Sequence, residues 1–203
     1  METKRSIFST VGEQITTLLS LVALLWAIEI ADWLLFGNRL PQFLGIRPHS
    51  VAGLWGIFFA PFLHGNFAHL LANTLPLLTL GWLVMLRGRG EWLAVSAITA
   101  LCSGLGTWLF GSPNSTHIGA SGVIFGYFGF LLLRGYFERS LTAIAFSLLV
   151  AFLYGGIIFG VLPTSQMISW EGHLFGFLGG ILAARLLAKP RRKPEDNYDN
   201  YDL

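Results

Sequence analysis

The sequence predicts an all-α membrane protein in which six transmembrane helices form one bundle with both termini in the cytoplasm. Three observations lead to this fold class: 54% of the 203 residues are hydrophobic, only 12% are charged, and the apolar residues gather in long stretches. An average soluble domain has about 25% charged residues. Six helices of about 20 residues each would use about 120 residues, which leaves enough for loops and tails but not for a second domain.

The apolar stretches follow one another with short connections. They cover residues 15–36, 67–86, 91–110, 119–135, 140–160 and 169–188. The first lacks a following small-residue cleavage site and is too long for a cleaved leader, so we interpret it as a signal anchor. The fourth and fifth are separated only by a charged turn, LLLRGYFERS (131–140). Together the stretches define a six-helix domain over residues 15–188.

The segments outside this domain are polar. Residues 1–14 are expected to be a cytoplasmic N-terminal tail. Residues 189–203, KPRRKPEDNYDNYDL, have no apolar face to bury and are expected to be a disordered cytoplasmic tail.

Basic residues predict the orientation, because cytoplasmic loops of membrane proteins carry an excess of Lys and Arg. With six crossings the termini share a side, and only Arg39 and Arg47 lie opposite. The side of the termini receives the other basic residues: Lys4, Arg5, Arg87, Arg89, Arg134, Arg139, Arg185, Lys189, Arg191, Arg192 and Lys193. We therefore expect cytoplasmic termini, and the histidines then lie in or near the outer loops.

Several classes of function are disfavoured by composition and by absent motifs. The net charge of +2 is too small for a typical nucleic-acid binder. A single cysteine, Cys102, excludes a disulfide framework and a cysteine-ligated zinc site, and we expect it to be a core residue. The H-E-x-x-H motif of a metalloprotease is absent. The two halves do not contain the matching broken helices that are typical of a transporter.

Polar residues recur at the same depth in three of the stretches. They lie in the segments HGNFAHLLAN (64–73), HIGASGVIFG (117–126) and SWEGHLFGFLGG (169–180), each of which enters the membrane from the outer side. Polar groups inside hydrocarbon are costly and mark function or a need for pairing. His69 and Asn73 are four residues apart and so share a helix face.

Four other polar residues have simpler expected roles. His49 and His117 are interpreted as polar anchors in the outer interface, and Glu29 and Asp32 as anchoring or packing residues near the end of the first helix.

Ser121 and His173 are the candidate pair of reactive residues. Ser121 lies in the first turn of its predicted helix, where free N–H groups and the helix dipole favour an oxyanion. A face formed by Gly172, Gly176 and Gly180 predicts that the last helix approaches a neighbour closely, for which the fourth is the candidate. A serine needs an adjacent base to become a nucleophile. The residues alone leave both an enzyme and a packing interface open.

These segments resemble the signatures of the rhomboid intramembrane serine proteases. The resemblance covers residues 10–188 and rests on H-x₄-H-x₃-N, G-x-S-G and H-x₂-G-x₃-G, which occur in the family's order. It implies that Ser121 is the nucleophile and that His173 is the general base and then the general acid. The other site residues that it implies are Asn73 and His69 in an oxyanion hole with the backbone near Ser121, and His64, Gly119, Gly122 and Phe125 in supporting roles.

The resemblance also implies an activity and a location. We expect an intramembrane serine endopeptidase that cleaves single-span membrane proteins in or near their transmembrane helices through an acyl-enzyme. Its partners would be these substrates and the lipid bilayer, without nucleic acid, metal or cofactor. The expected location is a bacterial plasma membrane, with the site open to the extracytoplasmic side. The alternative is an inactive rhomboid-like protein that binds transmembrane helices without cleaving them; such proteins typically lack the serine or the histidine.

Overall fold

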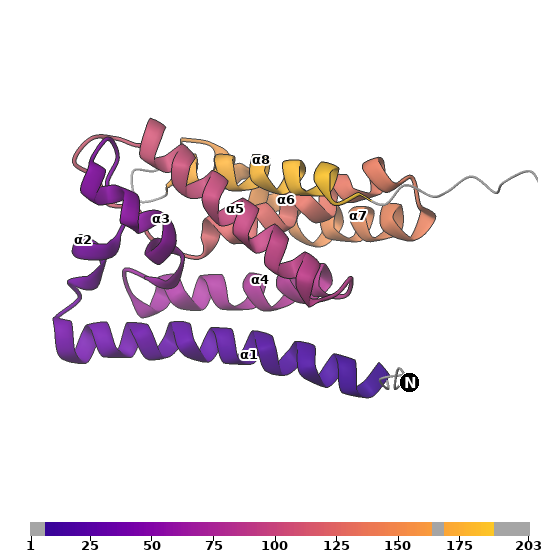
Figure 1. Cartoon of the computed structure of the whole chain (residues 1–203), viewed down its shortest axis with the longest axis horizontal. Coiled ribbons are helices and arrows are strands. Elements are labelled where there is room, and N and C mark those ends of the chain that lie inside the picture. Colours follow the sequence, from indigo (N-terminus) through magenta and orange to yellow (C-terminus); the bar gives the residue numbers. More distant parts are fainter. Residues whose placement is uncertain (1–6, 164–168, 189–203) are drawn as a thin grey trace, which may run out of the picture.

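The computed structural model describes residues 7–163 and 169–188, and all regular elements in these ranges are helical. The long helices lie roughly side by side, and the start of the first and the end of the last lie at the same end of the bundle (Figure 1). They are α1 (Ile7–Ala31), α4 (Phe67–Met85), α5 (Arg89–Phe110), α6 (Ser121–Glu138), α7 (Leu141–Tyr154) and α8 (Trp170–Leu186). Residues 1–6 and 189–203 lie outside the described ranges, so the disordered C-terminal tail stays a prediction.

Short helical turns connect the long helices. The first apolar stretch, expected as a helix to residue 36, ends in a π-helix at Asp32–Phe36. The outer loop that follows contains a series of short helical turns: α2 (Leu40–Leu44), a 3₁₀ turn at Val51–Trp55, α3 (Gly56–Phe59) and a 3₁₀ turn at Ala60–Phe62. A further 3₁₀ helix, η4 (Gly155–Val161), continues α7.

Four segments are long and apolar enough to cross a membrane. They are Thr10–Phe36, Phe67–Met85, Arg89–Phe110 and Leu141–Val161. The other two long helices are shorter or less apolar: α8 has 17 residues, and α6 contains several glycines and ends with a charged turn. A helix of 17 residues is at the lower limit for spanning hydrocarbon. The structure thus supports a membrane protein, and the count of six crossings stays a prediction.

Helices α6 and α8 make the most extensive contact between any two described elements. A methyl group on Gly176 would overlap the carbonyl oxygen of Gly122, and one on Gly180 would overlap that of Gly126. Gly122 in turn faces the hydroxyl of Ser103 on α5. Only glycine permits such backbone contact. The glycine face of the last helix was predicted to pack on the fourth apolar stretch, which is α6, and this prediction is confirmed.

Helix α1 begins earlier than the sequence predicts. It starts at Ile7 rather than near residue 15, so part of the expected N-terminal tail is helical. The Gln14 side chain is buried and donates a hydrogen bond of 3.0 Å to the carbonyl of Met85 at the end of α4. Hydropathy does not detect the helix before residue 15, because this part of α1 contains several polar residues. The side chain of Gln14 is paired only in the folded bundle.

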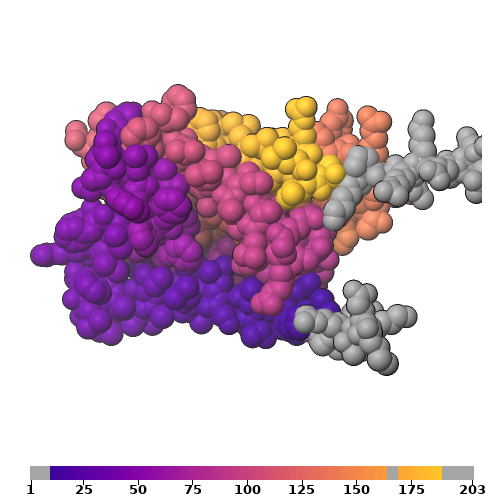
Figure 2. Space-filling view, in the orientation of Figure 1, coloured from indigo at the N-terminus to yellow at the C-terminus, as the bar shows by residue number. Residues whose placement is uncertain are grey.

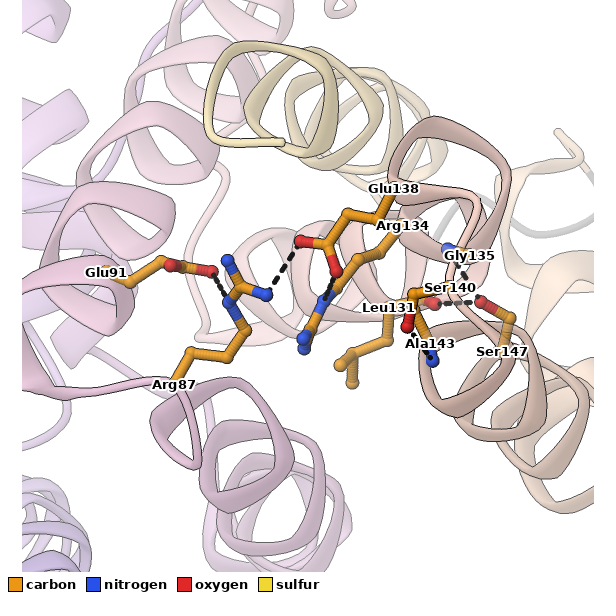
Figure 3. Close-up of polar contacts among 9 residues, drawn as sticks. All are labelled: Arg87, Glu91, Leu131, Arg134, Gly135, Glu138, Ser140, Ala143 and Ser147. Carbon is orange, nitrogen blue, oxygen red and sulfur yellow. Dashed lines mark hydrogen bonds and ion pairs between the residues drawn. The ribbon is translucent and has the colours of Figure 1, made fainter. Parts of the chain in front are cut away.

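A network of ion pairs joins the α4–α5 turn, α5 and α6 at the end of the bundle that carries the arginine-rich turns (Figure 3). Arg87 contacts Glu91 and Glu138 at 2.7 Å each, and Arg134 contacts Glu138 at 3.2 Å. These side chains are largely shielded from solvent. Partial burial of opposite charges stabilises a structure only when each charge keeps its partner, so this network holds the α4–α5 turn against the end of α6.

Candidate active site

Ser121 and His173 lie in hydrogen-bonding contact although 52 residues separate them. Ser121 is the first residue of α6, and His173 lies in the first turn of α8. The distance from Ser121 Oγ to His173 Nε2 is 2.8 Å. The glycine contacts between α6 and α8 make this distance possible, since they let the two backbones touch one turn below the pair.

The second nitrogen of His173 is held by the backbone of η4. His173 Nδ1 lies 2.9 Å from the carbonyl oxygen of Gly160, so Nδ1–H donates to that oxygen. This bond leaves the lone pair of Nε2 directed at the Ser121 hydroxyl, which is the tautomer that a general base needs. The sequence did not predict Gly160, because a main-chain oxygen has no residue-type signature. The uncharged carbonyl of Gly160 thus orients the His173 ring, and no buried carboxylate is needed for this.

The ring of Phe125 stacks on the ring of His173. The ring centroids are 4.1 Å apart and the planes differ by 8°. Phe125 lies one turn after Ser121 on α6 and is buried. The stack restricts rotation of the imidazole about its long axis, so Phe125 and Gly160 together fix its orientation. The resemblance implied only a supporting role for Phe125, and the stack on His173 shows the contact through which it can act.

Hydrogen-bond donors converge on the loop just before Ser121. Gly119 has φ of +111°, a conformation that strongly favours glycine, and a methyl group there would lie 2.8 Å from Cε1 of His69. Asn73 Nδ2 is nearby, and this buried amide has no hydrogen-bond partner among the described residues. The backbone N–H groups of the first turn of α6 are also unpaired in a helix start. These donors lie beside the loop that leads into Ser121, and their role in an oxyanion hole stays a prediction.

A small cavity adjoins Ser121. Its volume is about 30 Å³, enough for one or two water molecules. Its polar lining comes from Ser103 and Thr107 on α5, His117 in the loop before α6, and Ser169 at the start of α8. These groups would let a trapped water make several hydrogen bonds, so the site has a polar recess within the apolar bundle.

His117, expected only as an interfacial anchor, lies beside this cavity. Its Nδ1 is 2.7 Å from Ser169 Oγ, and its Nε2 is 2.7 Å from Ser115 Oγ. Its backbone pairs with Ile46 in an isolated antiparallel bridge. Burial lowers the pKa of His117, which the charge of Glu171 partly opposes. His117 therefore joins the loop before α6 to the start of α8.

His64 is packed beneath His69 at the entrance to α4. Its ring is 2% exposed, lies 5.1 Å from the His69 ring, and has no hydrogen-bond partner of good geometry among the described residues. Burial, together with the nearby His69, lowers the pKa of His64 to about 4, although the backbone of Phe62 opposes the shift. His64 is therefore an uncharged packing residue that supports His69.

Replacing His64 by phenylalanine is expected to flatten the pH dependence of stability. An unfolded His64, with a pKa near 6.5, binds a proton as the pH falls, whereas the folded residue stays neutral until about pH 4. Stability is therefore lost between these pH values, by about 2 kcal/mol on going from pH 7.5 to pH 5. Thermal unfolding of the wild type and of His64→Phe in detergent at both pH values measures the difference. Equal acid destabilisation of the two proteins would contradict the assignment.

Of the remaining polar residues that the sequence singled out, Asp32 and His49 have hydrogen-bond partners. Asp32 Oδ1 accepts hydrogen bonds from the N–H groups of Arg39 and Leu40 at 3.0 and 3.1 Å, so it anchors the start of α2. Glu29 is buried one turn earlier on α1. His49 lies apart from the site, and its Nε2 contacts the carbonyl of Leu109 at 2.9 Å. Cys102 packs against Gly179 of α8 but is only half-buried, whereas a buried core residue was expected.

Comparison with known proteins gives the family. The sequence model of the Rhomboid domain matches residues 51–190. The chain is 48% identical over 186 residues to Rv1337, an uncharacterized protein of Mycobacterium tuberculosis, covering 88% of this chain and 77% of that protein. It is 42% identical over 200 residues to ML1171, an uncharacterized protein of Mycobacterium leprae, covering 95% and 78%.

A relative that is named as a protease is more distant. The chain is 32% identical over 144 residues to the rhomboid protease GluP of Bacillus subtilis, covering 68% of this chain but only 27% of GluP. The matched domain spans more than half of the present chain and includes all the residues that converge on Ser121. With its bundle of apolar helices, this multi-pass membrane protein therefore belongs to the rhomboid family.

Proposed function

We propose that the protein is an intramembrane serine endopeptidase that cleaves membrane proteins in or near their transmembrane helices. The observation that carries the proposal is the 2.8 Å contact between Ser121 Oγ and His173 Nε2, with the opposite nitrogen of the imidazole held by the Gly160 carbonyl. A serine hydroxyl that only packs between helices does not require an oriented base. Membership of the rhomboid family supports the same activity.

The geometry supports an acyl-enzyme mechanism. His173 Nε2 takes the proton of Ser121 as Oγ attacks the scissile carbonyl. Asn73, His69 and the N–H groups at the start of α6 donate to the resulting oxyanion. The imidazolium then gives its proton to the leaving amine, and the acyl group stays on Ser121. A water from the small polar cavity, activated by His173, hydrolyses the acyl-enzyme and restores the serine.

The substrate class follows from the position of the site. Ser121 lies at one end of a helix within an apolar bundle, so a transmembrane substrate must locally unwind before its backbone reaches Oγ. We propose that single-span proteins with helix-breaking residues near their outer ends are the substrates. The exposed aromatic residues between α1 and α4, Trp55, Phe58 and Phe59, suit the membrane interface at this depth.

We propose six crossings of a bacterial plasma membrane, with cytoplasmic termini and the site near the extracytoplasmic surface. Ser121 lies at the end of α6 opposite to Arg134, and His173 at the end of α8 opposite to Arg185. The arginine-rich turns would then be cytoplasmic, as the distribution of basic residues in membrane proteins requires. An alkaline phosphatase that is active when fused to the C-terminus would contradict this topology.

Cleavage of a labelled single-span protein by the purified full chain tests the activity. In proteoliposomes we expect wild-type protein to release a fragment cut near the outer end of the substrate helix. We also expect covalent labelling by a serine-reactive fluorophosphonate. A protein that only binds transmembrane helices would instead bind the substrate and leave every substrate sequence tested uncleaved. It would also not be labelled by the fluorophosphonate. That result would overturn the proposed protease and favour the binding protein.

A further inference from the structure

A large cavity opens between α1 and α5, on the lipid-facing side of the bundle. Its volume is about 500 Å³. Figure 2 shows a recess on this face between α1, the segment around α3, and α5. Helix α1 packs chiefly on α4, whereas it makes few contacts with α5, so the two helices diverge and leave the space unfilled.

The wall of the cavity is almost wholly apolar. Leu21 and Leu25 line it from α1, and Leu93 and Ala97 from α5. The two hydroxyl groups in the wall satisfy each other: Ser96 Oγ and Tyr127 Oη are 2.6 Å apart. Since the wall presents hydrocarbon and paired hydroxyls, it matches a hydrocarbon ligand rather than a polar molecule.

The cavity is small compared with a whole transmembrane helix. A helix with side chains is at least about 10 Å wide, so 500 Å³ would contain only about four residues of it. A flexible hydrocarbon chain has no such width and can follow a cleft between two diverging helices. The cavity therefore fits an acyl chain better than a segment of a protein substrate.

A polar mouth follows the cavity along the same two helices. It is lined by Thr16, Thr17 and Ser20 on α1 and by Arg89, the first residue of α5. Arg89 Nη2 donates a 2.6 Å hydrogen bond to Thr17 Oγ1, which holds the guanidinium across the mouth. Glu13 also lines it. The start of α5 has no side-chain cap, so its N–H groups and dipole add to the positive charge of Arg89.

We propose that the cleft between α1 and α5 binds one phospholipid, with an acyl chain in the apolar cavity and the phosphate at Arg89. Along the two helices, Arg89 lies at the end of the bundle with the arginine-rich turns, and the apolar cavity lies toward the middle. A phospholipid has its charged headgroup and its hydrocarbon in the same order. A guanidinium is a usual partner of a phosphate. Ser20 can add a hydroxyl donor, whereas Thr16 and Thr17 donate to the backbone carbonyls of Gly12 and Glu13. The proposal does not depend on the proposed protease activity.

The bound chain would lie directly against the active-site helix. The floor of the cavity includes Ala120 and Val123, which flank Ser121 at the start of α6. Ile57 and Pro61 line both this cavity and the small polar cavity beside Ser121. A phospholipid in the cleft thus completes the packing of the wall that carries the nucleophile.

Native mass spectrometry of the delipidated full chain in detergent tests the proposal. Phosphatidylglycerol and phosphatidylethanolamine are titrated in parallel, and diacylglycerol serves as the lipid without a phosphate. We expect one molecule of either phospholipid to bind per chain. Ala97→Phe should weaken this binding at least about tenfold, because its ring blocks the apolar path. Ala23→Phe is the matched control: Ala23 is an exposed alanine of α1 that does not line the cavity, and its variant should bind as the wild type does.

The phosphate contact has its own test within the same titration. The wild type should prefer a phospholipid to diacylglycerol at least about tenfold, and Arg89→Gln should remove that preference. Equal weakening by Ala97→Phe and Ala23→Phe, unchanged binding in Ala97→Phe, or equal binding of diacylglycerol and phospholipid by the wild type would overturn the proposal. Because the readout is bound lipid, absence of proteolysis would not affect the result.

Discussion

Ser121→Ala is expected to abolish proteolysis, with a fall in kcat of about 10⁶-fold. The variant loses Oγ, the atom that forms the acyl-enzyme. Oγ lies 2.8 Å from His173 Nε2, and no other hydroxyl among the described residues makes this contact. His173→Ala should cost about as much, because Ser121 is a weak nucleophile without its base. The double variant should lose little more than either single variant, since the two residues act as a unit. Single-turnover cleavage of a single-span substrate in proteoliposomes measures all three.

Ser112→Ala provides a control for these measurements. Ser112 is an exposed serine in the loop before α6 and lies outside the site. Its variant should cleave the substrate and react with a fluorophosphonate as the wild type does. Ser121→Ala should remain folded, as judged by its thermal unfolding, and should not be labelled. Cleavage or labelling that persists in Ser121→Ala would refute the assignment of the nucleophile.

Gly176→Val should lower kcat at least about 100-fold and also lower the temperature of unfolding. The valine side chain would overlap the backbone of Gly122, so α8 must move away from α6. Gly122 follows Ser121 directly, and Gly176 lies one turn after His173, so the movement separates the hydroxyl from the imidazole. A displacement of about 1 Å in reacting groups can cost about 100-fold in rate.

Gly90→Val is the matched control for the packing argument. A side chain at Gly90 meets no atom within 4 Å, and the residue lies in the first turn of α5, far from Ser121. Because valine has a higher helix propensity than glycine, this substitution should not destabilise the helix and should leave kcat unchanged. Wild-type cleavage by Gly176→Val would show that close contact of α6 and α8 is not needed for the site.

Much of the fold was predictable because its signals are local in sequence. The six long helices coincide with the six apolar stretches to within a few residues at most ends, since the thickness of hydrocarbon sets both their length and their composition. The spacing of Gly172, Gly176 and Gly180 predicted a close helix contact, because residues four apart share a face. The motifs around His69, Ser121 and His173 indicated a site by residue type and by depth in the membrane.

The sequence by itself therefore determined the helices, the close contact of the last helix and the candidate nucleophile and base. Only the tertiary structure decided that the Gly160 carbonyl orients His173, that His117 lies beside the site, and that a cleft separates α1 from α5. The reason is physical. Hydropathy and periodicity describe one helix at a time, whereas a main-chain oxygen, a loop histidine and a cleft between helices acquire their roles from how separate helices pack.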